Sequence, residues 1–209
     1  METDKFVLVH NDMQFCESFF EILDKELEET GRGNFIQYIT YEPPVYVEHK
    51  RDGKIIRDWN GWEDFNSYVQ TNSSDLGELQ EVKGGFFRAG WTEDIQTLGG
   101  FDQTAFEVFC EDDDLVLRTM LEGYHTLLSR KACVYHFVSK TTNTLGRGAK
   151  EEVSCRAFYV KWGILPYQVF SLPLDIIKEL IDQKTLGIVS SFDEPETNYL
   201  KLQRTLTYE

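Results

Sequence analysis

Four consecutive carboxylates, Glu111 to Asp114, carry the clearest chemical signal in the sequence. Apolar side chains follow them with the i, i+3, i+4, i+7 spacing of one helical face, at Leu117, Met120, Leu121 and Tyr124. We therefore expect the carboxylates on the first turn of a helix, where free N–H groups and the helix dipole favour negative charge. Crowded carboxylates repel one another, which raises the pKa of at least one of them unless a cation or a ligand compensates.

A carboxylate with a raised pKa can take a proton from a substrate hydroxyl near neutral pH, so the cluster is suited to general-base catalysis. An acid-rich helix start on a solvated face explains the same pattern without any chemistry. From the periodicity alone, this second interpretation is the one that we favour.

A second group of polar residues follows a short apolar run near the start of the chain. Phe6 to Val9 is typical of a buried strand, and it ends directly in His10, Asn11 and Asp12. Ligands bind at the carboxyl ends of strands in open α/β sheets. A carboxylate at such a position suits Mg²⁺ or Mn²⁺, although a lone aspartate there is also a common turn former or helix cap.

The rest of the chain alternates between segments typical of strands and of helices, which predicts an α/β fold. We expect strands at residues 6–9, 35–41, 45–48, 81–88 and 132–138. Besides the helix after the carboxylates, we expect helices at residues 15–31, 59–69 (or an aromatic-rich loop), 91–98, 151–162 and 173–183. Residues 139–150 are polar and contain two glycines, which is typical of a mobile loop.

The composition limits the class of protein. The chain has 209 residues, of which 41% are hydrophobic, enough for one domain and a short appendage. Its net charge of −15 argues against nucleic acid or an anionic membrane as the main partner. No apolar run approaches the roughly 20 residues of a transmembrane segment, and the start lacks signal-peptide features. The four cysteines form no Cys-x-x-Cys pair, which favours reduced thiols in a cytoplasmic protein.

The central stretch also resembles a known family. Gly99-Gly100-Phe-Asp102, then Glu111-Asp-x-Asp-Leu-x-x-Arg118, then Gly-Tyr, is similar to the acceptor-side signature of family 2 glycosyltransferases of the GT-A fold. The resemblance covers roughly residues 4–163. It implies a GT-A-like, Rossmann-related mixed sheet with flanking helices over residues 1–165, and leaves residues 166–209 as a helical extension and tail.

The resemblance implies roles for the acidic residues and their neighbours. Asp112 falls where the family places its catalytic base, and Glu111 would contact the acceptor or orient that base. The acceptor would lie against four further residues of this region, Gly99, Gly100, Asp102 and Trp91, the last as an aromatic face for a sugar ring. Asp114 and Arg118 are expected to pair with neighbouring structure.

The same resemblance implies a divalent metal, Mn²⁺ or Mg²⁺, that bridges the donor diphosphate. His10 and Asp12 occupy the two acidic positions of the family's Asp-x-Asp turn, and His136 resembles a histidine that lies near the metal or the diphosphate. Imidazole suits Mn²⁺ better than Mg²⁺, or His10 hydrogen-bonds the phosphate instead. Lys140 and Arg147, in the polar loop, would close over the diphosphate.

The function implied is inverting transfer of a sugar from a nucleotide-sugar donor to a glycan or lipid-linked acceptor, as in polysaccharide biosynthesis. Family members carry a nucleotide-binding half before the Asp-x-Asp turn, which here begins at residue 10. We therefore expect the C-terminal portion of a GT-A-like domain that binds Mn²⁺ and nucleotides weakly by itself. The alternative is a non-catalytic remnant that binds a glycan or a partner.

Overall fold

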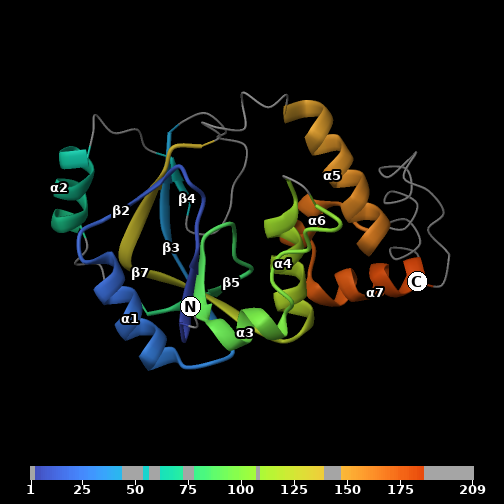
Figure 1. Ribbon diagram of the computed structural model, residues 1–209, viewed down its shortest axis with the longest axis horizontal. Coiled ribbons are helices and arrows are strands. Elements are labelled where there is room, and N and C mark those ends of the chain that lie inside the picture. Colours follow the sequence, from blue (N-terminus) through green and yellow to red (C-terminus); the bar gives the residue numbers. More distant parts are fainter. Residues whose placement is uncertain are drawn as a thin grey trace. The chain divides into compact units, whose positions relative to one another are not determined.

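The computed structural model describes residues 3–43, 54–56, 62–72, 78–106, 109–138 and 147–185. The protein is a mixed α/β protein with a strongly curled mixed sheet and flanking helices (Figure 1). The chain divides into two compact units. The first comprises Met1–Gly100 and Leu115–Arg147, and the second comprises Phe101–Asp114 and Gly148–Glu209.

The sheet belongs to the first unit, and its main path runs in the order β1-β6-β3-β7-β2 (Figure 1). These strands are β1 (Lys5–Leu8), β6 (Arg88–Trp91), β3 (Asn34–Glu42), β7 (His125–His136) and β2 (Met13–Phe15). Two short strands lie off this path, and they are β4 (Lys54–Ile56), which pairs with β3, and β5 (Gln80–Val82), which pairs with β7. The pairing of β3 with β7 is parallel, whereas β1–β6 and β2–β7 are antiparallel.

The register between β3 and β7 shifts once, and this irregularity bends the sheet. Tyr38 pairs with Ser129, but the next residue, Ile39, pairs with Cys133, which leaves residues 130–132 outside the ladder. Extra residues in one strand increase the local twist. The same bend lets β7 pair with β5 before it and with β2 after it.

Both faces of the sheet are covered by helices. One face packs on α1 (Phe19–Thr30) and α2 (Trp62–Asn72) through a large apolar core. The α1 side chains in this core recur every fourth residue, which places them on one face of the helix, at Phe19, Leu23 and Leu27. Phe35 points to the opposite face, where it meets Leu98, after α3 (Thr92–Thr97), and Leu115 of α4 (Glu111–Leu121).

The described part of the second unit is mainly helical. It contains α5 (Arg147–Trp162) from residue 148 onward, α6 (Pro166–Ser171), α7 (Leu174–Thr185) and the first turn of α4. Its buried apolar side chains include Phe106, Phe158, Ile164, Val169 and Ile177. The division of the chain at residue 165, expected from the sequence, stays a prediction.

The sequence placed most elements correctly, with a few corrections. The segment 81–88 is not one strand but β5 and β6, which are separated by the irregular residues 83–87, where Gly84 has a φ of +98° that suits glycine. Phe15 lies in β2 and not in α1, and β7 begins at His125 instead of residue 132. Residues 147–150 are helical, not loop, and α6 was not expected. The segments 45–48 and 59–61 lie outside the described residues.

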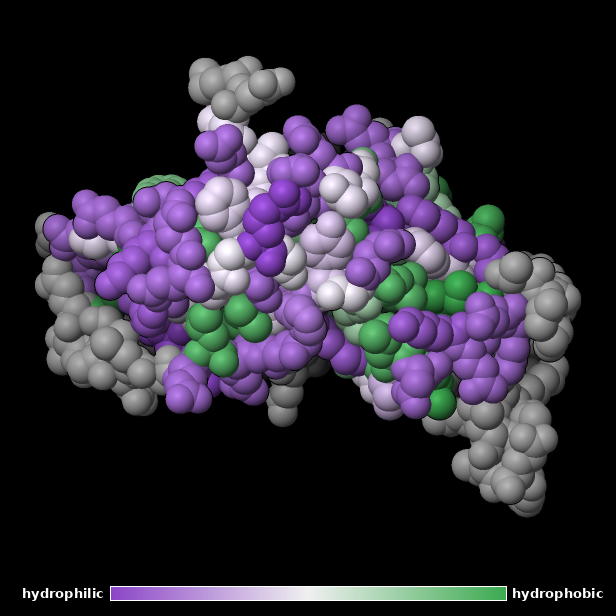
Figure 2. Space-filling model, turned by 90° about the horizontal axis from the view of Figure 1, so that it is seen from below, coloured by the Kyte–Doolittle hydropathy of each residue, from purple (hydrophilic) through white to green (hydrophobic). Residues whose placement is uncertain are grey.

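The surface in Figure 2 is mainly hydrophilic, with hydrophobic residues gathered in small separate patches, as the net charge of −15 leads one to expect. No helix among the described residues is long and apolar enough to cross a lipid bilayer. The four cysteines are free thiols.

Gly163 ends α5 and supplies the first test of the fold. Its φ is +75°, and a Cβ atom there would lie 2.6 Å from Cβ of Lys184, whose ammonium group caps the helix on the carbonyl of Lys161 at 2.6 Å. We expect Gly163→Ala to lower the free energy of unfolding by more than about 1–2 kcal/mol, the usual cost of a left-handed alanine. Gly123→Ala is the control, because Gly123 ends α4 at φ +77° in open space. Equal losses in urea unfolding would contradict the packing described for Lys184.

Candidate metal centre and carboxylate cluster

Three side chains that could bind a metal ion come together in the first unit. His10 follows β1, Asp12 precedes β2, and His136 is the last residue of β7. Nε2 of His136 lies 3.2 Å from Oδ1 of Asp12 and 3.4 Å from Nδ1 of His10. The ligand atoms that the three residues offer all lie within 4.8 Å of one another. The structure therefore brings together the three residues that the sequence predicted as metal ligands.

Strand pairing explains why these residues meet. Met13 is paired with His136 across the β2–β7 ladder. The ladder is extended by one bond, since the backbone N–H of Phe137 donates to the carbonyl oxygen of Asp12 at 2.9 Å. Asp12 and His136 are thus fixed by backbone hydrogen bonds, although they lie far apart in the sequence.

A buried ion pair lies behind His136. Nδ1 of His136 is 2.9 Å from Oε1 of Glu42, and Nζ of Lys54 is 2.6 Å from Oε2 of the same carboxylate. Burial raises the pKa of Glu42, but the hydrogen bonds from His136 and Lys54 outweigh it and hold that pKa below its usual value. Glu42 is therefore a charged acceptor that occupies one nitrogen of His136 and leaves Nε2 facing Asp12 and His10.

Phe86 forms an apolar wall beside the two histidines. Its ring is stacked on the imidazole of His10, with centroids 4.8 Å apart, and its centroid lies 4.5 Å from that of His136. Such contacts restrict the rotation of both imidazoles. The donor set of two imidazole nitrogens and one carboxylate oxygen fits a divalent transition metal, and His136 has the outer-shell carboxylate that ligating histidines usually carry.

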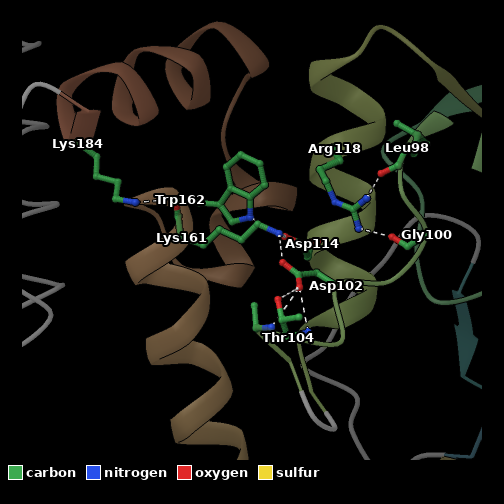
Figure 3. Close-up of polar contacts among 10 residues, drawn as sticks. Leu98, Gly100, Asp102, Thr104, Asp114, Arg118, Lys161, Trp162 and Lys184 are labelled. Atoms are coloured by element: carbon green, nitrogen blue, oxygen red, sulfur yellow. Dashed lines mark hydrogen bonds and ion pairs between the residues drawn. The ribbon is translucent and has the colours of Figure 1, made fainter. Parts of the chain in front are cut away.

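The four carboxylates of α4 differ sharply in their surroundings within the second unit. Asp114 is completely buried and accepts hydrogen bonds from Nζ of Lys161 and from Nε1 of Trp162, both at 2.7 Å (Figure 3). Its backbone N–H donates to the carbonyl oxygen of Cys110 at 2.9 Å, which closes the first turn of the helix. Asp114 therefore has a structural role, as expected from the sequence.

Glu111 is the acidic residue of this cluster with the most altered pKa. Partial burial, with the negative charge of Asp112 as a second cause, raises the pKa of Glu111 to about 7. Its Oε2 atom is buried and has no hydrogen-bond partner within the part of the chain that the structure describes. Asp112 is half-buried, and its Oδ1 accepts the backbone N–H of Asp113 at 3.0 Å. The crowding expected from the sequence therefore acts on Glu111.

Asp102 is engaged by internal partners at both carboxylate oxygens. Oδ1 accepts from the hydroxyl of Thr104 at 2.6 Å and from the backbone N–H of Ala105 at 3.1 Å, and Oδ2 accepts from Lys161 at 2.8 Å (Figure 3). These bonds, led by the one from Lys161, hold the pKa of Asp102 far below its usual value. Lys161 thus joins Asp102 to Asp114.

The remaining acceptor-side residues belong to the first unit. Arg118 donates to the carbonyl oxygens of Leu98 and of Gly100, the latter at 2.6 Å, and so fixes the turn that contains Gly99 (Figure 3). Trp91 is half-buried at the end of β6, and the ammonium group of Lys5 lies 5.1 Å from its ring centroid. The roles of these residues in acceptor binding stay predictions. Lys140 and the side chain of Arg147 lie outside the described part of the structure.

Sequence inspection missed Glu42, Lys54, Phe86 and the polar role of Lys161. Glu42 ends a strand rich in aromatic and β-branched residues, and a carboxylate at the end of a buried strand needs a partner. This was the signal in the sequence that could have identified Glu42. The partners themselves depend on strand register, which the sequence does not reveal. A scan against protein-family models and a search of curated proteins both find no match for this chain.

The raised pKa of Glu111 predicts a specific pH dependence of stability. Folding disfavours the ionised carboxylate, so the penalty is absent below the usual pKa of 4.5 and is complete above about 7. We expect Glu111→Gln to stabilise the protein near pH 8 by about 1–2 kcal/mol, after allowance for partial exposure, and by much less near pH 5. Urea unfolding at both pH values measures this. Glu122→Gln, an exposed site just after α4, should show no such difference. If the free energy of unfolding of Glu111→Gln depended on pH as that of the wild type does, the raised pKa of Glu111 would be refuted.

Proposed function

We propose that this chain is a GT-A-like glycosyltransferase that transfers a sugar from a nucleotide-sugar donor to a glycan or lipid-linked hydroxyl acceptor with inversion. The observation that carries the proposal is the meeting of His10, Asp12 and His136 beyond the end of β1. The family resemblance assigns these residues to one metal site. His136 is far from His10 and Asp12 in the sequence, so nothing in the sequence alone required the three residues to be close in space. The acidic helix start and the Gly99-Gly100 turn support the same assignment.

His10, Asp12 and His136 would hold the divalent ion, which when bound supplies positive charge to the leaving diphosphate. Lys54 and Glu42 keep His136 oriented, because both oxygens of Glu42 are engaged. Phe86 excludes water from one side of the two imidazoles. The residues of the first unit therefore account for stabilisation of the leaving group in this proposal.

The carboxylates of α4 would supply the general base. Asp112 takes this role in the proposal, since it is the residue that matches the family's base and its side chain is half-buried, whereas that of Asp114 is completely buried. Glu111 supports it, because a carboxyl with a pKa of about 7 beside Asp112 can exchange a proton near neutral pH. Inverting transfer then needs no covalent intermediate, and the acceptor oxygen attacks as its proton leaves.

Loss of the base gives the test of this proposal. We expect Asp112→Asn to lower kcat by about 10²–10⁴-fold with little change in KM, because an amide cannot accept the proton. Release of nucleoside diphosphate from a panel of nucleotide sugars, with saccharide acceptors and Mn²⁺, measures turnover by the complete open reading frame that contains these residues.

A control variant and a second test variant accompany that assay. Glu122→Gln removes one charge close to α4 and should keep wild-type turnover. Glu111→Gln should flatten the acidic limb of the pH–rate profile if Glu111 exchanges the proton. Near-normal turnover by Asp112→Asn would remove Asp112 from its role. Saccharide binding without transfer from any donor would favour the non-catalytic alternative.

A further inference from the structure

We propose that Glu42, held by Lys54, is a positioning residue that prepares His10, Asp12 and His136 for a borderline divalent cation of the Zn²⁺ or Co²⁺ type, bound before any donor. The inference rests on the metal site of the proposed function and deepens it. It adds the class of metal, the order of binding and a residue that no sequence motif indicates.

The donor atoms favour a borderline metal over a hard one. Mg²⁺ prefers six oxygen ligands and keeps several waters, whereas imidazole nitrogen suits Zn²⁺, Co²⁺ and their neighbours. Two of the three candidate ligands here are imidazoles, and the third is a carboxylate. Three protein ligands with an open fourth position is the usual arrangement of a catalytic zinc ion, and the open position would accept a diphosphate oxygen.

The spacing of the ligands fits a small four-coordinate ion. Metal–nitrogen bonds of about 2.0–2.1 Å place two ligands of a tetrahedral ion about 3.3 Å apart. The two distances from Nε2 of His136, 3.2 Å to Asp12 and 3.4 Å to His10, lie on either side of that value. Little rearrangement of the two neighbours of His136 is therefore needed for binding.

Glu42 determines which nitrogen of His136 is available. A carboxylate only accepts hydrogen bonds, so Nδ1 of His136 must donate its hydrogen to Oε1 of Glu42, 2.9 Å away. In the neutral imidazole, the lone pair of Nε2 then faces Oδ1 of Asp12, which is also only an acceptor. Two lone pairs directed at one point are stabilised by a cation between them.

Lys54 keeps Glu42 in this role. It is paired with Thr40 across the β3–β4 ladder, so its side chain lies on the same face as that of Glu42, two residues further along β3. Its ammonium group occupies Oε2 of Glu42, and both side chains are about nine-tenths buried, 10% and 7% exposed. Glu42 is thereby held as the partner of His136 and is not available as a fourth ligand.

Calorimetric titration without nucleotide tests the inference on the whole chain. We expect wild-type protein to bind Zn²⁺ and Co²⁺ with one ion per chain and far more tightly than Mg²⁺. Glu42→Gln should weaken Zn²⁺ and Co²⁺ binding by about 10–100-fold, the usual effect of losing an outer-shell partner of a metal-bound histidine. The visible absorption of bound Co²⁺ should also change, because it reports ligand geometry. Glu21→Gln, an exposed site on α1, is the control and should bind like wild type.

A second variant separates positioning from folding. Glu42→Gln with Lys54→Met removes both charges of the pair, so no unpaired charge stays buried, and its metal affinity should match that of Glu42→Gln. Wild-type affinity and Co²⁺ absorption in both folded variants would overturn the role of Glu42. Preference for Mg²⁺, or no ion bound without a nucleoside diphosphate, would overturn the metal class. Neither result would prevent sugar transfer in the assay described above. Failure of this inference can therefore be distinguished from failure of the proposed function.

Discussion

The pairing of β7 with β3 on one side and β2 on the other is the constraint on which the candidate metal centre depends. Tyr41 pairs with Tyr135, so Glu42 lies beside His136, while Met13 pairs with His136 from the other edge. A shift of β7 by one residue against β3 would turn the side chain of His136 to the opposite face of the sheet. The backbone ladders thus fix a polar group whose members come from distant parts of the chain.

The buried charges at the end of β7 explain why this arrangement is specific. Glu42, Lys54 and His136 are about nine-tenths buried, and the two oxygens of Glu42 are paired with Lys54 and His136. Removal of one member of such a group costs about 3–5 kcal/mol, because it leaves an uncompensated charge. The pKa of Glu42 is depressed, so the stability that this pair contributes is present above the usual value of 4.5 and is lost as the pH falls through the lower folded-state value.

The sequence predicted the elements whose signal is local. The apolar run of β1, the helical spacing after Glu111 and the glycine that ends α5 each act over a few residues, and the structure has them where expected. Strand boundaries were harder to predict, as β5 and β6 show. The irregular residues 83–87, with Gly84 at positive φ, interrupt a pattern that is β-like throughout in the sequence.

The candidate site was predictable only in part. His10 and Asp12 follow a strand and His136 ends one, so their positions could be inferred. Glu42 comes into contact with Lys54 and with His136 through the registers of β3 with β4 and with β7, which the sequence does not reveal. Within α4, four similar carboxylates could not be ranked from the sequence. Burial distinguishes them, since Asp114 is paired with Lys161 and Trp162 whereas Glu111 has an unpartnered oxygen among the described residues.

We propose that His10, Asp12 and His136 at the strand ends hold an ion that contacts a diphosphate. A crystal structure of the protein with Co²⁺ and uridine diphosphate, with anomalous data collected at the cobalt edge, tests this most directly. We expect one strong anomalous peak about 2.0–2.2 Å from ligand atoms of His10, Asp12 and His136, with a diphosphate oxygen as a further ligand. Cobalt bound elsewhere, or a diphosphate bound away from these residues while they contact only one another, would contradict it.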